Sequence, residues 1–88
     1  MKEKRIEKDI KRWRDSENYT ILMVASWNGR LNILKWLLEE VKFDVNERNS
    51  YFQTAFHCAA YNKQVECARL LLKHGATLYN FNLAMVPL

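Results

Sequence analysis

Apolar and polar positions recur at helical spacing in two matching pairs of segments. Short apolar segments at 21–28 and 55–62 are each followed by a longer apolar stretch, at 31–40 and 64–74. Thr20 and Thr54, which suit helix N-caps, precede the first segment of each pair and lie 34 positions apart. A single helix pair cannot bury its own apolar face, so it must stack on a neighbour. The pattern therefore predicts an all-α stack of helix–turn–helix repeats.

A further helix is predicted over residues 2–13, before the first repeat. Ile6, Ile10 and Trp13 recur at i, i+4 and i+7 and form one narrow apolar stripe. Because terminal repeats need a polar outer cover, we expect this basic amphipathic helix to lay its stripe over the first repeat as a cap. The predicted organisation is a capping segment, two repeats and the start of a truncated third: residues 1–17, 18–51, 52–85 and 86–88.

The two copies share small, polar and leucine positions. The second copy contains Thr54, His57, Ala59, Leu70-Leu71-Leu72 and Gly75-Ala76, and the first contains Thr20, Leu22, Ala25, Gly29, Leu37-Leu38 and Asp44-Val45-Asn46. With their period, these residues resemble the ankyrin repeat family, whose signature is T-P-L-H-x-A. The resemblance implies a helical stack with extended finger loops between the repeats. It also implies protein–protein recognition without catalysis, as an adaptor or scaffold.

Some positions depart from the family pattern. They are Met23 in place of histidine, Ile21 and Ala55 in place of proline, and Phe52 and Lys63 in place of glycine. One extra residue lies within 41–43 of the first repeat. Because Met23 cannot reproduce the Thr–His hydrogen bond of the family, we expect the first turn of the first repeat to be looser.

The resemblance also implies where a partner docks. Ankyrin proteins bind on the concave side, through finger tips and the exposed edges of the first helices. The matching positions in this sequence are Ser16, Glu17, Tyr19, Trp27, Asn28, Arg48, Ser50, Tyr51, Gln53, Tyr61, Asn62 and Phe81. Trp, Tyr and Arg dominate the energetics of interfaces, which makes the aromatic members the strongest candidates.

Trp27 and Tyr61 occupy the same place in the two copies, so stacking of the repeats predicts that they lie side by side. Packing of both side chains against the fingers of their own domain is the alternative interpretation. We expect Phe52 to be buried under its finger.

Positive charge is concentrated at the start of the chain. The net charge is +4, and residues 1–14 contain seven basic and three acidic side chains, whereas the remainder contains seven of each. Basic stripes attract phosphate, so a nucleic-acid or anionic-membrane tether through this helix is an alternative function. Acidic residues interrupt the stripe and its apolar side is thin, so both partners are disfavoured. A third alternative is a purely structural piece of a larger scaffold.

Other chemistry has no support in the sequence. His57, Cys58, Cys67 and His74 fit no zinc spacing, so no metal is predicted. Cys67 and His74 are two helical turns apart, out of hydrogen-bond reach, and there is no glycine-rich phosphate loop. We therefore expect neither a catalytic site nor a cofactor.

The sequence also predicts where the protein is located and how it assembles. No apolar run reaches about 18 residues, which excludes a membrane span, and the basic N-terminus lacks the apolar core of a secretory signal. Two cysteines without such a signal indicate an intracellular setting, cytoplasmic or nuclear. The uncovered C-terminal repeat face, through Leu72, Leu78 and Val86, is predicted to accept further repeats or a second copy of the chain.

Overall fold

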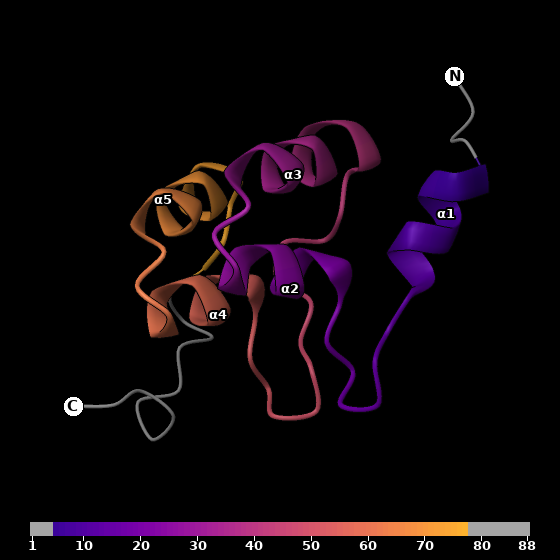
Figure 1. Ribbon diagram of the computed structural model, residues 1–88, viewed down its shortest axis with the longest axis horizontal. Coiled ribbons are helices and arrows are strands. Elements are labelled where there is room, and N and C mark those ends of the chain that lie inside the picture. Colours follow the sequence, from indigo (N-terminus) through magenta and orange to yellow (C-terminus); the bar gives the residue numbers. More distant parts are fainter. Residues whose placement is uncertain (1–4, 78–88) are drawn as a thin grey trace.

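Four short helices form two layers in the computed structural model of the chain, which describes residues 5–77 (Figure 1). One layer contains α2 (Ile21–Trp27) and α4 (Ala55–Tyr61), and the other contains α3 (Leu31–Trp36) and α5 (Val65–Lys73). A further helix, α1 (Arg5–Arg12), precedes them. Residues 5–77 contain helices and loops but no strand, which confirms the predicted all-α stack.

Threonine caps start the first helix of each repeat. The hydroxyl oxygen of Thr54 accepts from the backbone N–H of His57 at 3.4 Å, and the N–H of Thr54 donates to Nδ1 of His57 at 2.9 Å. In the first repeat Thr20 accepts from the N–H of Met23 at 3.2 Å and donates to the Met23 sulfur at 3.5 Å. The thioether therefore takes the place of the imidazole. The bond from the threonine N–H is longer than in the second repeat, at 3.5 against 2.9 Å, whereas the bond to the threonine hydroxyl is shorter, at 3.2 against 3.4 Å. The looser first turn stays a prediction.

The extra residue of the first repeat is accommodated at the end of its second helix. After Trp36 the helix continues as a π-helical turn, η1, over Leu37–Val41. Lys42 then adopts a left-handed conformation with φ 63° and ends the helix, as Gly75 does after α5 with φ 97°. A π-turn contains one more residue than an α-turn, so the insertion leaves the following finger in register.

The core lies between the two layers. Leu34, Leu37 and Leu71 are fully buried, and Ala59 lets α4 pack closely against α2. Cys58 and Cys67 are each 2% exposed and complete the core as small apolar groups. Burial of this apolar surface between the repeats is the main stabilising term of the fold.

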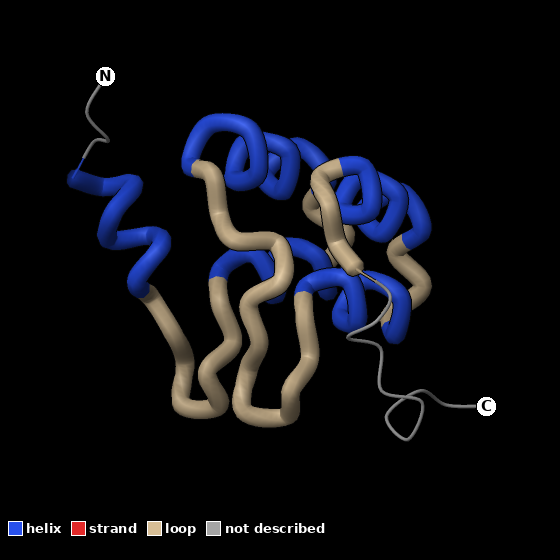
Figure 2. Tube along the Cα trace, turned by 180° about the vertical axis from the view of Figure 1, so that it is seen from behind, coloured by secondary structure: helices blue, strands red, loops and turns tan. Residues whose placement is uncertain are grey.

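Two finger loops project from the layer of α2 and α4 and lie side by side (Figure 2). The first precedes α2, and the second connects η1 to α4. The N–H of Ser50 donates to the carbonyl of Glu17 at 3.0 Å, which ties one finger to the other. Asp15 and Asn49 each accept two backbone N–H groups of their own finger, at 2.8 to 3.0 Å. The fingers are therefore fixed by the same side-chain turn, repeated at equivalent positions.

Helix α1 lies beside α3, at the end of the stack that is distant from α5 (Figure 1). Of its predicted stripe, Ile10 packs against the core cluster, while Ile6 is 64% exposed and Trp13 is also exposed. The ion pair between Arg14 and Glu47 connects the segment after α1 to the second finger. Ile10 is thus the residue of the stripe that packs on the core, and the capping role stays a prediction.

Candidate protein-binding face

Four aromatic side chains gather on the α2–α4 layer and its fingers: Tyr19, Trp27, Tyr51 and Tyr61, which we call the aromatic face. The rings of Trp27 and Tyr61 stack with their centroids 5.9 Å apart and an interplanar angle of 28°. Their predicted side-by-side position is therefore confirmed. Trp27 remains 41% exposed and Tyr61 48% exposed, so the pair is presented to solvent.

Hydrogen bonds from the second repeat brace the backbone beneath Trp27. The carbonyl oxygen of Trp27 accepts from Nδ2 of Asn62 at 2.7 Å and from Nε2 of Gln64 at 3.1 Å. Asn62 was predicted as a partner-binding residue, and in the structure its amide nitrogen already serves this inter-repeat bond. Because the pair is held from below, it loses little conformational freedom when a partner packs on it.

The two tyrosines nearest the fingers are also fixed. Tyr19 is half-buried, and its hydroxyl donates to Oε1 of Gln53 at 3.1 Å. Tyr51 is 46% exposed, and its hydroxyl donates to a carboxylate oxygen of Glu17. Burial raises the pKa of Tyr19, and the hydrogen bond to Glu17 raises the pKa of Tyr51. Both phenols therefore stay neutral at physiological pH and act as amphipathic contact groups.

An open hollow of about 240 Å³ lies next to Trp27 and Tyr19. It is lined by Asp15 of the first finger, Tyr19 before α2, Val24 and Trp27 of α2, and the C-cap residue Asn28. Val24, Trp27 and Asn28 lie at i, i+3 and i+4, which places them on one side of α2. The hollow thus joins one carboxylate to two aromatic walls.

Some of the other predicted site residues form hydrogen bonds within the protein, and others are exposed. Nδ2 of Asn28 donates to the carbonyl of Val24 at 2.9 Å, and Gln53 joins Tyr19 to Asn49. Ser16, Glu17, Arg48 and Ser50 are exposed on the fingers, and Phe81 lies outside the described residues. The described members of this set therefore lie on α2 and the fingers, next to the aromatic face.

Phe52 corrects the prediction made for it. The side chain was expected to be buried under its finger, but it is 64% exposed. Its backbone is left-handed, with φ 63°, as expected for a position where the family has glycine. With this backbone conformation the side chain lies exposed next to Tyr51. In the sequence, the replacement of the family's glycine was the sign of this backbone conformation.

Three of the groups considered for metal or nucleophilic chemistry, His57, Cys58 and Cys67, are buried inside the stack, whereas His74 is partly exposed and lies 3.8 Å from the carboxylate of Glu39. Burial raises the pKa of the Cys58 thiol to about 12 and also raises that of Cys67. Burial and the Arg48 charge lower the pKa of His57. Within residues 5–77, no three His, Cys, Asp or Glu side chains are placed to hold a metal ion. No helix in this range is long and apolar enough to cross a membrane.

The stacked helix pairs, capped helices and paired fingers define a helical repeat protein. A family model described as ankyrin repeats in three copies matches residues 3–82. The chain therefore belongs to the ankyrin repeat family, which the signature residues predicted. Ankyrin repeats are generally protein–protein interaction modules and are typically non-catalytic.

Curated relatives carry the same repeats inside longer proteins. The chain is 40% identical over 55 residues to the palmitoyltransferase akr1 of Schizosaccharomyces pombe, covering 62% of this chain and 9% of that protein. It is 32% identical over 85 residues to the human transient receptor potential cation channel subfamily A member 1, covering 93% of this chain and 7% of the channel.

A shorter relative is the bovine ankyrin repeat domain-containing protein 49, 33% identical over 79 residues. The match covers 90% of this chain and 30% of that protein. The chain thus spans less than a third of the length of each of these relatives. What they have in common with it is the repeat unit.

Proposed function

We propose that this ankyrin repeat unit binds a protein partner through the aromatic face, without catalysis. The observation that carries the proposal is the Trp27–Tyr61 stack, which is nearly half exposed although the second repeat holds its backbone in place. Preorganised aromatic side chains give large contact area at low entropic cost. The partner is a folded protein or a peptide segment that fills the space between the stack and the fingers.

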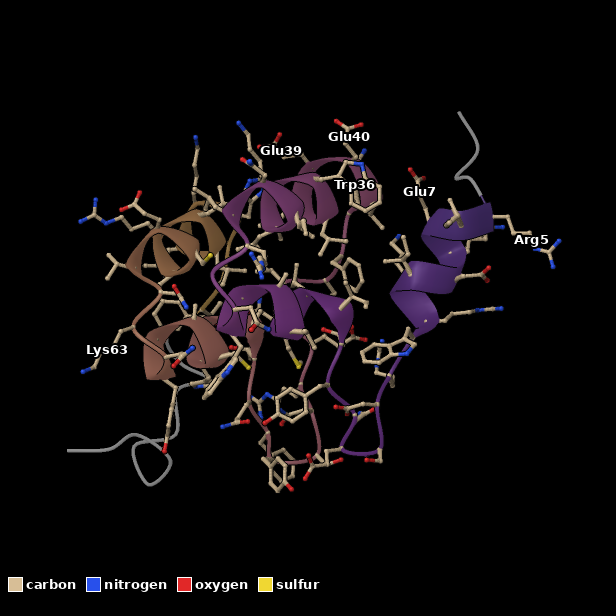
Figure 3. All side chains as sticks on the ribbon, viewed as in Figure 1. Arg5, Glu7, Trp36, Glu39, Glu40 and Lys63 are labelled. Atoms are coloured by element: carbon tan, nitrogen blue, oxygen red, sulfur yellow. The ribbon has the colours of Figure 1, made fainter. Side chains whose placement is uncertain are left out.

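The function is tested by affinity capture from nuclease-treated cell extract at two salt concentrations. The bait is the wild-type chain beside Trp27→Ala/Tyr61→Ala, with partners identified by mass spectrometry. The matched control is Trp36→Ala, because Trp36 is 40% exposed, as Trp27 is, but belongs to α3 in the other layer (Figure 3). Loss of a central aromatic residue should weaken the binding free energy by about 2 kcal/mol, which raises Kd by about 30-fold.

A protein retained by the wild type and by Trp36→Ala but lost by the double variant supports the proposal. Identical capture by all three baits contradicts it. In that case a scaffold role, in which both rings serve stability only, would show as a lower unfolding midpoint of the double variant without any change in capture.

The geometry of α1 favours a second candidate, a tether to an anionic surface. None of its residues is buried, Ile6 is exposed, and Arg5 points away from the stack (Figure 3). Binding through this helix would weaken steeply with salt, whereas binding through the aromatic face would be comparatively insensitive to salt. Measuring capture of nucleic acid and of phosphatidylserine vesicles, with and without residues 1–14, separates the two.

The proposed setting is intracellular. Cys58 and Cys67 are free thiols within the core, and neither forms a disulfide. Reduced cysteines that serve as apolar core groups are typical of proteins in the cytoplasm or nucleus. Imaging of the tagged chain in cells would test this location.

A further inference from the structure

We propose that the hollow beside Trp27 receives a basic side chain, lysine or arginine, of the protein partner. The inference rests on the proposed function and names the chemistry of the partner at one point of the aromatic face. It comes from three features of the hollow: its aromatic walls, its single carboxylate, and the fact that the fold does not require the charge of that carboxylate.

The walls suit a long side chain with a charged end. Trp27 and Tyr19 line the hollow, and aromatic rings attract cations through the quadrupole of the π system, with Trp the best of the aromatic residues for this contact. Val24, 37% exposed, offers an apolar surface for the methylene stem of lysine or arginine. The volume of about 240 Å³ is ample for one such side chain.

The carboxylate of Asp15 supplies the opposite charge. Its Oδ1 accepts from the N–H groups of Glu17 and Tyr19, at 2.9 and 2.8 Å. Within residues 5–77, Asp15 has no ion pair, whereas the neighbouring Arg14 is neutralised by Glu47. The second carboxylate oxygen of Asp15 is therefore open to a charged donor from outside.

The charge of Asp15 is not needed for the turn in which it lies. Asn49, the equivalent residue of the second finger, accepts from the N–H groups of Tyr51 and Gln53 at 2.8 and 3.0 Å with a neutral amide. An asparagine would thus serve the first finger equally well. The turn therefore does not explain the negative charge at the rim of the hollow, whereas binding of a cationic ligand does.

Glu17 adds a second negative charge near Tyr19. The pKa of Tyr19 is raised first by burial and then by Coulombic interaction with Cys58, Glu17 and Asp15. Burial disfavours a charge of either sign, but the negative charges of Glu17 and Asp15 favour a cation at this place over phosphate or a carboxylate. An uncharged apolar ligand would leave the Asp15 carboxylate desolvated without a partner, which is costly.

The test is an NMR titration of the uniformly ¹⁵N-labelled chain with short glycine–serine peptides. One peptide has a central arginine, one has lysine, and one has citrulline, the neutral isostere of arginine. We expect saturable shifts of the Trp27 indole and of the amides of residues 15–19 with arginine or lysine. Because a cation–π contact and a charge-assisted hydrogen bond are both lost with citrulline, its Kd should be higher by about tenfold.

The variant Asp15→Asn removes the charge while keeping the Asx turn, and the Kd for the arginine peptide should rise by about fivefold. The matched control is Glu40→Gln, the same change of charge on the exposed outer side of η1, and it should leave the Kd unchanged. Retained amide shifts in the unbound Asp15→Asn chain would verify its fold.

The inference is overturned if the arginine and citrulline peptides bind equally, if the shifts map to the outer helices, or if no peptide binds up to its solubility limit. It is also overturned if the captured partner is bound equally by Asp15→Asn and wild type while Trp27→Ala/Tyr61→Ala loses it. That last outcome would leave the proposed function standing, so the two failures are distinguishable.

Discussion

Replacing Lys63 by glycine should make the protein more stable. Lys63 has φ 60° and stands where the first repeat has Gly29, with φ 68°. A left-handed conformation brings the Cβ of any L-residue close to a carbonyl oxygen, which costs roughly 1–2 kcal/mol. The side chain of Lys63 projects away from the stack (Figure 3), so its removal loses little packing.

The size of the effect follows from two opposing terms. Relief of the left-handed strain gains about 1–2 kcal/mol, and the greater freedom of glycine in the unfolded chain takes back about 0.5–1 kcal/mol. The backbone bond from the Lys63 N–H to the Ala60 carbonyl, 3.2 Å long, is retained. With both terms at the middle of their ranges, the net gain is about 0.75 kcal/mol, which for a domain of this size raises Tm by about 3–6 °C.

Urea and thermal unfolding followed by circular dichroism would measure this gain. The matched control is Lys35→Gly, the same chemical change at an exposed position of α3, where glycine costs about 1 kcal/mol. Opposite signs for the two variants are expected. If Lys63→Gly is neutral or destabilising while Lys35→Gly behaves as expected, left-handed strain does not account for the energetics of this turn.

Three further predictions concern buried and tightly packed groups. Because burial lowers the folded-state pKa of His57, the unfolded chain takes up the proton first, and stability falls as pH drops below about 6.5. His57→Met, which copies the first repeat, should therefore flatten the pH dependence of the urea midpoint, whereas an unchanged dependence would assign it to other groups. Cys58 and Cys67 should react with Ellman's reagent at pH 8 only as fast as the chain unfolds, because both are 2% exposed and burial raises their pKa values. Rapid labelling of the native chain would contradict this prediction. Gly29→Ala should destabilise by about 1–2 kcal/mol in urea unfolding, because alanine is strained at this positive φ and its Cβ would lie 2.4 Å from the Gln64 side chain. A neutral result would contradict the strain itself, since movement of Gln64 relieves only the contact.

Much of the fold could be predicted because its signals are local. The 34-residue spacing and the two threonine caps placed four helices close to their observed ends. The side-by-side position of Trp27 and Tyr61 followed from the period, since equivalent residues of stacked repeats become neighbours, whereas the stacking of their rings was not predicted.

What could not be predicted depends on contacts between distant parts of the chain. The cap sulfur of Met23 and the π-turn that takes up the inserted residue are local solutions that no periodicity shows. The amide nitrogens of Asn62 and Gln64 meet at the carbonyl of Trp27 only once the repeats stack. Polar residues on a predicted binding face were therefore indistinguishable, in the sequence, from residues that hold the face together.

Phe52 is the residue at which local rules and structure disagree most, and the disagreement bears on function. A bulky side chain at φ 63° is strained, and at 64% exposure it gains little from burial. Lys63 shares the strain, but as an exposed charged residue it fits the solvent that surrounds it. A sequence that keeps an aromatic residue where both backbone and solvent disfavour it departs from the consistency expected of a purely structural position. Because Phe52 adjoins Tyr51 at the tip of the second finger, this departure lies at the border of the aromatic face, where contact with a partner would offset both costs.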